Sequence, residues 1–300
     1  MIKGESGKLK TESLLWHFIA STAKFQAHVV RLIKMKILEY NISNGVRAFS
    51  TMRGEGPGNY DGFNITPYCG DSPLHVAMCR ESLCAQLGIA DSQLILPYQT
   101  HSDKVAVIDS HFMQLSDEER YKALQGIDAV VTALPHICIG VSTADCIPVL
   151  LHDRKRNVIA AIHAGWRGTV AGIVKKSIEV MSRCYNSCAQ DIRAIIAPGI
   201  SIDAFEVGDE VYEEFCKACF AMQQIARRYP ATDGGEKWHI DLWEANSLLL
   251  QLCGVAKENI HIAGVCTYKN CTDFFSARRL GIKSGRIFSG ILLKPDLVYG

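Results

Sequence analysis

The 300-residue sequence lacks the features that would point to a charged or extended partner. Its 32 lysines and arginines are balanced by 31 aspartates and glutamates, so no basic excess argues for binding to nucleic acid. No apolar run approaches the roughly 18 residues that cross a membrane, and no internal repeat or low-complexity tract is present. We therefore expect a globular protein that acts on small molecules, as a monomer or a homodimer.

The sequence also lacks an export signal and any regular spacing of its 12 cysteines. Small secreted domains arrange their cysteines in a disulfide framework, whereas cysteines scattered over a long chain are typical of free thiols. We therefore expect free thiols and a cytoplasmic location.

Residues 1–34 differ from the rest of the chain because basic residues interrupt a short apolar set there. The segment could be a transit peptide or an amphipathic helix on a membrane surface, or, more simply, a leader upstream of a true start at Met35 or a loosely attached helix. We favour the simpler interpretation, since chain ends are usually poorly tied down. No linker rich in proline or charge divides the chain after residue 35, so residues 35–300 are expected to form one catalytic domain.

The order of apolar segments predicts a single layered α/β sandwich domain with a mixed β-sheet. Hydrophobic residues make up 48% of the chain, which is ample for one core. The expected strands cover residues 37–42, 46–51, 94–96, 105–108, 126–132, 136–141, 149–152, 157–163, 192–196, 260–265 and 287–293. The expected helices cover residues 73–88, 169–184, 209–226 and 241–252.

Chemically distinctive residues gather at the ends of two expected strands. Cys146 follows Asp145, and His163 precedes a turn that contains two glycines; His101 lies in a polar turn between two further strands. Two histidines and a cysteine can supply three ligands of a catalytic zinc site that keeps a fourth position open. One isolated histidine would more simply be a satisfied core side chain, but Asp145 and Pro148 are poor residues for a strand interior.

The same three residues allow two other kinds of chemistry. Cys146 could be a thiolate nucleophile that His163 activates. Two histidines and a cysteine are also the strong ligands of a blue-copper centre. Copper is the weaker interpretation, because the 10 histidines include no His-x-His pair of the kind that a multicopper cluster needs.

Arginines near loop ends are candidates for binding an anion, although each could instead be a surface charge. Arg167 stands apart because it lies four residues beyond His163 and directly before an expected helix, whose first N–H groups also attract anions. Asp145 and Glu206 are the candidate groups for proton transfer.

Four segments together resemble the signatures of one bacterial family. They are Gln99-Thr-His101-Ser-Asp-Lys-Val105, Gly126-Ile-Asp128-Ala-Val-Val-Thr132, Thr143-Ala-Asp145-Cys146-Ile-Pro148 and His163-Ala-Gly-Trp-Arg-Gly168. The family was long labelled multicopper polyphenol oxidase or laccase-domain protein, and the likeness extends over about residues 37–293. Its members are understood as zinc-dependent purine nucleoside enzymes.

The resemblance implies phosphorolysis of adenosine, inosine, guanosine and S-methyl-5'-thioadenosine, together with deamination of adenosine. It implies zinc ligation by His101, Cys146 and His163, and a layered fold related to cysteine hydrolases. Purine nucleosides and phosphate are the implied partners, and substrate contacts are expected from Arg53, Asn64 and Arg278. A cysteine hydrolase of amide or ester bonds, for instance in cell-wall precursors, is the alternative enzyme, and a copper-dependent polyphenol oxidase is another. A zinc-binding protein without catalysis is the remaining interpretation.

Overall fold

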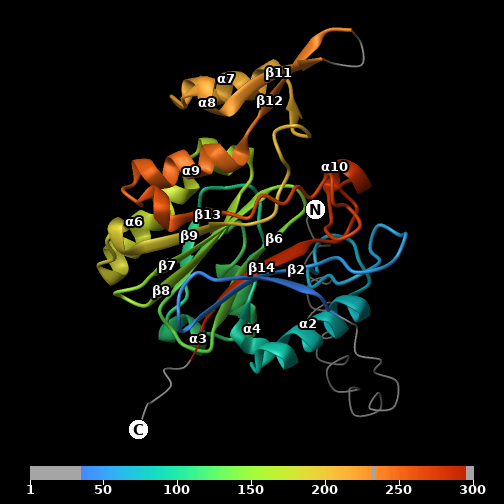
Figure 1. Ribbon diagram of the computed structural model, residues 1–300. Coiled ribbons are helices and arrows are strands. Elements are labelled where there is room, and N and C mark those ends of the chain that lie inside the picture. Colours follow the sequence, from blue (N-terminus) through green and yellow to red (C-terminus); the bar gives the residue numbers. More distant parts are fainter. Residues whose placement is uncertain (1–34, 231–233, 295–300) are drawn as a thin grey trace, which may run out of the picture.

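The computed structural model describes residues 35–230 and 234–294, which build three β-sheets (Figure 1). The five-stranded sheet contains, in spatial order, β1 (Ile37–Tyr40), β2 (Val46–Thr51), β14 (Ile287–Leu293), β6 (Cys138–Thr143) and β3 (Leu94–Ile95). The six-stranded sheet contains β13 (Ile260–Ile262), β9 (Ile192–Ile196), β7 (Ile147–Asp153), β8 (Val158–Ala164), β5 (Ala129–Thr132) and β4 (Val105–Val107). Both sheets combine parallel and antiparallel pairs, as the expected mixed sheet requires.

The two larger sheets stack face to face around an apolar layer. Ala48, Ile139 and Ile291 of the five-stranded sheet belong to the same buried cluster as Leu150 and Ala161 of the six-stranded sheet. The neighbours of Leu150 along β7 belong to a different cluster on the opposite face, because side chains alternate along a strand. All seven residues of β7 and all seven of β8 are buried, which explains their nearly continuous apolar sequences.

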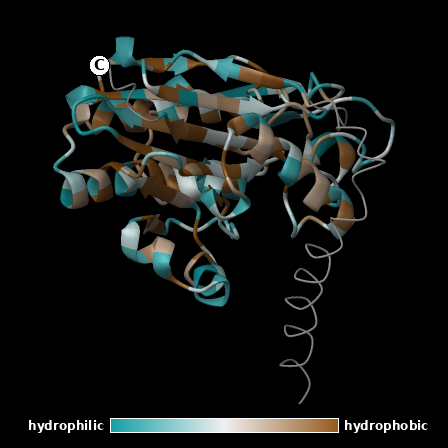
Figure 2. Ribbon diagram, turned by 90° about the horizontal axis from the view of Figure 1, so that it is seen from below, coloured by the Kyte–Doolittle hydropathy of each residue, from teal (hydrophilic) through white to brown (hydrophobic). Residues whose placement is uncertain are grey.

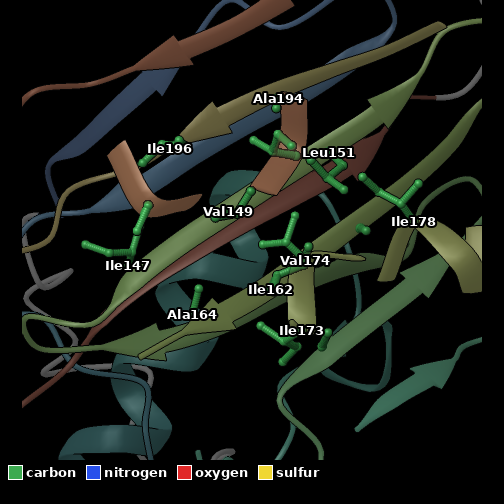
Figure 3. Close-up of a cluster of buried hydrophobic side chains, with 14 of the residues drawn as sticks. Ile147, Val149, Leu151, Ile162, Ala164, Ile173, Val174, Ile178, Ala194 and Ile196 are labelled. Carbon is green, nitrogen blue, oxygen red and sulfur yellow. The ribbon is translucent and has the colours of Figure 1, made fainter. Parts of the chain in front are cut away.

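Helices cover the outer face of each sheet and complete a four-layer sandwich. Cys79 and Leu83 of α2 (Pro73–Leu87) pack on the five-stranded sheet. The six-stranded sheet is covered by α6 (Ile173–Tyr185) and α9 (Leu242–Leu252), and Figure 3 shows Ile173 and Val174 of α6 beside the strand residues. Apolar segments concentrate within the stacked layers, while polar residues occupy much of the outer helix faces (Figure 2). The layered α/β sandwich expected from the sequence is confirmed.

The helix expected over residues 169–184 is divided into two helices. The first, α5 (Trp166–Val170), starts earlier than expected and has only five residues. Gly172 then adopts a left-handed conformation with φ 74°, and α6 begins at Ile173. A residue in the left-handed conformation cannot continue a right-handed helix, so Gly172 causes the break between the two helices.

The single helix expected over residues 209–226 is wrong. The helix α7 (Asp209–Lys217) ends where Cys219 takes φ 61°, and the N–H of Phe220 donates to the carbonyl of Phe215. The rings of Phe215 and Phe220 have centroids 5.0 Å apart, so a hydrophobic contact closes this turn.

The chain continues into a small sheet that was not expected from the sequence. The strands β11 (Ala226–Pro230) and β12 (Glu236–Ile240) follow α8 (Met222–Ile225) and pair with each other, and β12 also pairs with β10 (Glu206–Val207), which precedes α7. Figure 1 shows this sheet with α7 and α8 projecting from one end of the layered body. Trp238 of β12 stacks on Tyr212 of α7 with ring centroids 4.0 Å apart, which ties the sheet to the helix.

The remaining elements are short. The helices α3 (Ser110–Gln114), α4 (Asp117–Ala123) and α10 (Ala277–Leu280) and three 3-10 turns at residues 91–93, 189–191 and 257–259 connect the strands. All 12 cysteines are free thiols, as expected. Within the described residues, no helix combines the length and apolar character needed to span a bilayer. The expectation for residues 1–34 lies outside those residues and stays a prediction.

Candidate metal centre

Strand pairing brings Cys146 and His163 to one end of the six-stranded sheet. In the antiparallel pair of β7 and β8, Pro148 lies opposite His163. Two steps further along the same register, Cys146, directly before β7, lies beside Gly165, directly after β8. The antiparallel pairing of β7 and β8 therefore brings Cys146 and His163 close together.

His101 completes the group from the loop between β3 and β4. One ligand atom from each of His101, Cys146 and His163 lies within 4.8 Å of the others, and the Sγ of Cys146 is 3.7 Å from the Nε2 of His101. Zinc bonds of about 2.0–2.3 Å in a tetrahedron would hold such donors about 3.5 Å apart, which is close to the observed separation of Cys146 and His101. His163 is buried and His101 is exposed, which leaves the site open toward solvent on the side of His101.

Gly165 leaves the space that two of these ligands occupy. A Cβ at this position would lie 2.9 Å from the Cδ2 of His101 and 3.0 Å from the Sγ of Cys146. Carbon atoms at rest approach each other to about 3.5–4.0 Å, so a side chain here would push the ligands away. From the sequence, Gly165 was recognisable only as a turn residue.

Asp128 is hydrogen-bonded to two of the candidate ligands, His101 and His163. It was not identified as a site residue from the sequence. Its carboxylate is fully buried and accepts a 2.6 Å hydrogen bond from the Nδ1 of His163. Burial acts to raise the pKa of Asp128, but the hydrogen bond and the charge of His163 lower it to about 2. One signal was available in the sequence, a lone acid at the start of an otherwise apolar segment.

The charges of the site favour a thiolate. Burial opposes ionisation of Cys146, yet the neighbouring His163 and His101 lower the pKa of the thiol below its ordinary value. Burial likewise opposes protonation of His163, while Cys146 and Asp128 raise the pKa of its ring. A thiolate with two imidazoles is a donor set that suits zinc, since a metal ligand must first lose its proton.

Asp145 is held rigidly next to Cys146. It has φ 88°, a left-handed conformation that is costly for a residue with a side chain. The hydroxyl of Thr267 donates to its Oδ1 at 2.7 Å, and the N–H of Arg278 donates to its Oδ2 at 2.6 Å. Both carboxylate oxygens therefore serve as acceptors that fix the segment leading into Cys146.

Arg167 and Arg278 are both exposed. The guanidinium carbon of Arg167 lies 4.2 Å from the ring centroid of Trp166, in the first turn of the short helix α5. The Nη2 of Arg278 donates to the carbonyl of Glu206 at 3.0 Å, and its guanidinium lies over the ring of Phe205. Both arginines are open to solvent at positions that adjoin the candidate ligands or their supports.

Arg53 and Asn64 are used by the protein's own loops. Arg53 is 5% exposed, and its side chain donates to the carbonyls of residues 56, 58, 61 and 271. Asn64 is fully buried and donates to Asp71 at 2.7 Å, while its oxygen accepts backbone N–H groups of residues 66 and 286. Their expected contacts with substrate stay a prediction.

Comparison with known proteins identifies relatives that match most of the chain. The family model described as multi-copper polyphenol oxidoreductase laccase matches residues 47–294. A purine nucleoside phosphorylase of Bacteroides thetaiotaomicron is 45% identical over 236 residues, which are 79% of this chain and 86% of the relative. Adenosine deaminase RL5, from an unknown prokaryotic organism, is 47% identical over 266 residues, or 88% of this chain and 100% of the relative. The crystal structure of the hypothetical protein YfiH from Bacillus licheniformis superposes with a TM-score of 0.78 at 28% identity, covering 88% of this chain and 98% of that one.

Proposed function

This chain belongs to the multi-copper polyphenol oxidoreductase laccase family, and we propose that it is a purine nucleoside phosphorylase that also deaminates adenosine. The observation that carries the proposal is the pair of relatives at 45% and 47% identity, which are named for these two activities and match most of the chain. The proposed substrates are purine nucleosides, namely adenosine, inosine, guanosine and S-methyl-5'-thioadenosine, together with phosphate.

The proposed cofactor is one zinc ion held by His101, Cys146 and His163. Among residues 35–230 and 234–294, these three form the one group of histidine, cysteine and acidic side chains close enough to share a metal. A copper oxidase that reduces dioxygen needs a cluster with many more histidines, so the family's description is a poor guide to the chemistry of this group. Bound zinc would supply Lewis-acid chemistry to both reactions.

In phosphorolysis, an oxygen of phosphate bonds to C1' of the ribose while the bond from C1' to the purine nitrogen breaks. The exposed guanidinium of Arg167 is proposed to bind this phosphate, because a planar guanidinium can donate two parallel hydrogen bonds to an anion. Arg278 is proposed to contact the nucleoside, because its backbone N–H donates to Asp145, the residue directly before Cys146. Holding both reactants in place supplies much of the catalysis in such a reaction.

In deamination, water replaces the amino group at C6 of adenine and ammonia leaves. A group that moves protons is then required, and Glu206 is proposed for it because its side chain is exposed and its carbonyl contacts Arg278. Asp145 is proposed to act beside it as a hydrogen-bond acceptor. We further propose a cytoplasmic location, where thiols stay reduced, and a monomeric or homodimeric protein.

The proposal is tested by incubating the zinc-loaded full chain with adenosine, with and without phosphate, and separating the products. Adenine and ribose 1-phosphate that form only with phosphate indicate phosphorolysis, whereas inosine that forms without phosphate indicates deamination. His101→Ala should lose both activities, while His111→Ala, at an exposed position on α3, is the matched control that should keep them. Absence of turnover of every purine nucleoside would contradict the proposal and favour the cysteine hydrolase.

A further inference from the structure

The carboxylate of Asp128 accepts more hydrogen bonds than its connection to His163 alone requires. It is fully buried, directly before β5, and accepts five hydrogen bonds from four residues. The donors are the N–H of Thr100 at 3.1 Å, the N–H of His101 at 3.0 Å, the N–H and hydroxyl of Ser102 at 2.7 Å each, and the Nδ1 of His163 at 2.6 Å. One buried charge is therefore bonded to the segments that carry two of the proposed metal ligands.

On the side of His163, the carboxylate determines which ring nitrogen carries the proton. An ionised carboxylate only accepts hydrogen bonds, so the Nδ1 of His163 must be the donor. The neutral ring then keeps its lone pair on Nε2, the nitrogen that remains for a metal. The backbone reinforces this placement, because the N–H of His163 donates to the carbonyl of Asp128 at 2.7 Å.

On the side of His101, the carboxylate stabilises an unusual backbone. His101 has φ 62°, in the left-handed region that residues with a side chain rarely adopt. Three successive N–H groups, from Thr100 to Ser102, donate to the two oxygens of Asp128. Such a run of N–H groups forms a concave site for an anion, and here the protein supplies the anion itself. The Ser102 Oγ also lies 2.7 Å from the carbonyl oxygen of Gly126, so its single proton is shared between that carbonyl and the carboxylate, which fastens the loop to the segment before β5.

We propose that Asp128 is the positioning residue that assembles the two histidine ligands of the metal centre. It orients the ring of His163 and, through the same carboxylate, fixes the loop that presents His101. The inference rests on the proposed zinc site, and it adds that the site depends on a residue that contacts neither the metal nor the substrate. Without the negative charge, the loop loses its shared acceptor and the ring of His163 loses the partner that fixes its tautomer.

The test compares the zinc affinity of Asp128→Asn with that of the wild-type full chain by competition with a chromophoric chelator. An asparagine keeps the size of the side chain but replaces one oxygen with an NH2 group, which would face N–H donors at either position. We expect the zinc affinity to fall at least tenfold, since losses of about 10- to 100-fold are typical when a group that orients a ligand histidine is removed. In the cobalt-substituted protein, the ligand-field absorption should change as well, which a loss of stability alone would not cause.

Asp153→Asn is the matched control. Asp153 is also fully buried and also accepts two backbone N–H bonds, from Lys155 and Arg156, but it lies at the opposite end of β7 from Cys146. It should keep the zinc affinity of the wild type even if its melting temperature falls. If Asp128→Asn does not fold, Ser102→Ala decides the question, because it removes one hydrogen bond to the carboxylate and should give a smaller loss of affinity in a folded protein.

The outcomes separate this inference from the proposed function. Wild-type zinc affinity in folded Asp128→Asn, or in Ser102→Ala where that variant must decide, would overturn the role of Asp128 and leave the zinc enzyme intact. A wild-type protein that binds no zinc would overturn both. Weaker binding in Asp128→Asn with unchanged binding in Asp153→Asn would support the inference.

Discussion

Replacing Gly165 with alanine should damage the metal centre while sparing the fold. Gly165 has φ −66° and ψ 167°, an extended conformation that alanine adopts without strain. The added methyl group would instead meet the Cδ2 of His101 at 2.9 Å and the Sγ of Cys146 at 3.0 Å. Relief of the contact with carbon alone requires a shift of about 0.6–1.1 Å, given a normal separation of about 3.5–4.0 Å.

A shift of this size is several times the roughly 0.2 Å within which the distances of a metal site should match their ideal values. The exposed ring of His101 can move away, so the protein should fold, and its free energy of unfolding should change by no more than about 1 kcal/mol. We expect the zinc affinity to fall about 10- to 100-fold, in line with other disturbances of ligand orientation. Both enzymatic activities should fall with zinc occupancy.

The assay is chelator competition for zinc, with the melting temperature of each protein measured in parallel. Gly172→Ala is the control, because no atom lies within 4 Å of its added Cβ but its φ of 74° is unfavourable for alanine. It should cost about 1–2 kcal/mol of stability and leave zinc binding unchanged. Wild-type zinc affinity in Gly165→Ala would refute the reasoning, since it would mean that the ligands do not occupy the space beside this glycine.

Four further predictions concern single sites and the chain end. Cys146→Ser should lower the zinc content, measured by elemental analysis of the folded protein; an inactive variant with full zinc would instead indicate a nucleophile. Arg167→Ala should weaken phosphorolysis much more than adenosine deamination in product assays, and equal losses would make the arginine a structural residue. The hydrogen bond between the Sγ of Cys79 and the Nε2 of His75 is the main cause that raises the pKa of His75 to about 9. The protonated ring therefore stabilises the folded protein below about pH 6.5, and this contribution is lost as the pH rises through 9. His75→Gln should flatten the fall in melting temperature over that interval, and an unchanged slope would contradict this role of His75. Deleting residues 1–34 should leave the melting temperature and activity unchanged, and a large drop in either would show that the segment packs on the domain.

The layered fold could be predicted from the sequence because its central strands are buried on both faces and read as apolar runs. Cys146 and His163 could also be singled out as candidates, since each stands at the end of an apolar strand that does not need it, and His101 became a candidate from a polar turn through the resemblance. The structure places these three together, as the interpretation required. Local periodicity was sufficient for β7 and β8, whose bounds differ from the expected ones by a few residues.

Features that depend on distant contacts were not predictable in the same way. The partners of Asp128 lie up to 35 positions away, so its role emerges only when β5 and β8 are paired. The end of α7 depends on the left-handed Cys219 and on the contact between two phenylalanine rings, neither of which a helical period reveals. The hydrogen bonds of Arg53 to backbone carbonyls were likewise not predictable, because one of these carbonyls belongs to Cys271, 218 positions away.

The position of β14 has a consequence for synthesis of the protein on the ribosome. This strand follows all the other described strands in the sequence, yet it lies in the middle of the five-stranded sheet, between β2 and β6. The hydroxyl of Ser289 in β14 shares a hydrogen bond with that of Ser50 in β2 across 239 positions. Every segment from β2 to β14 must therefore emerge before β2 and β6 are joined, and until then each exposes an unpaired edge to other nascent chains. Translation thus leaves two strand edges open until β14, which follows every other described strand, has been made.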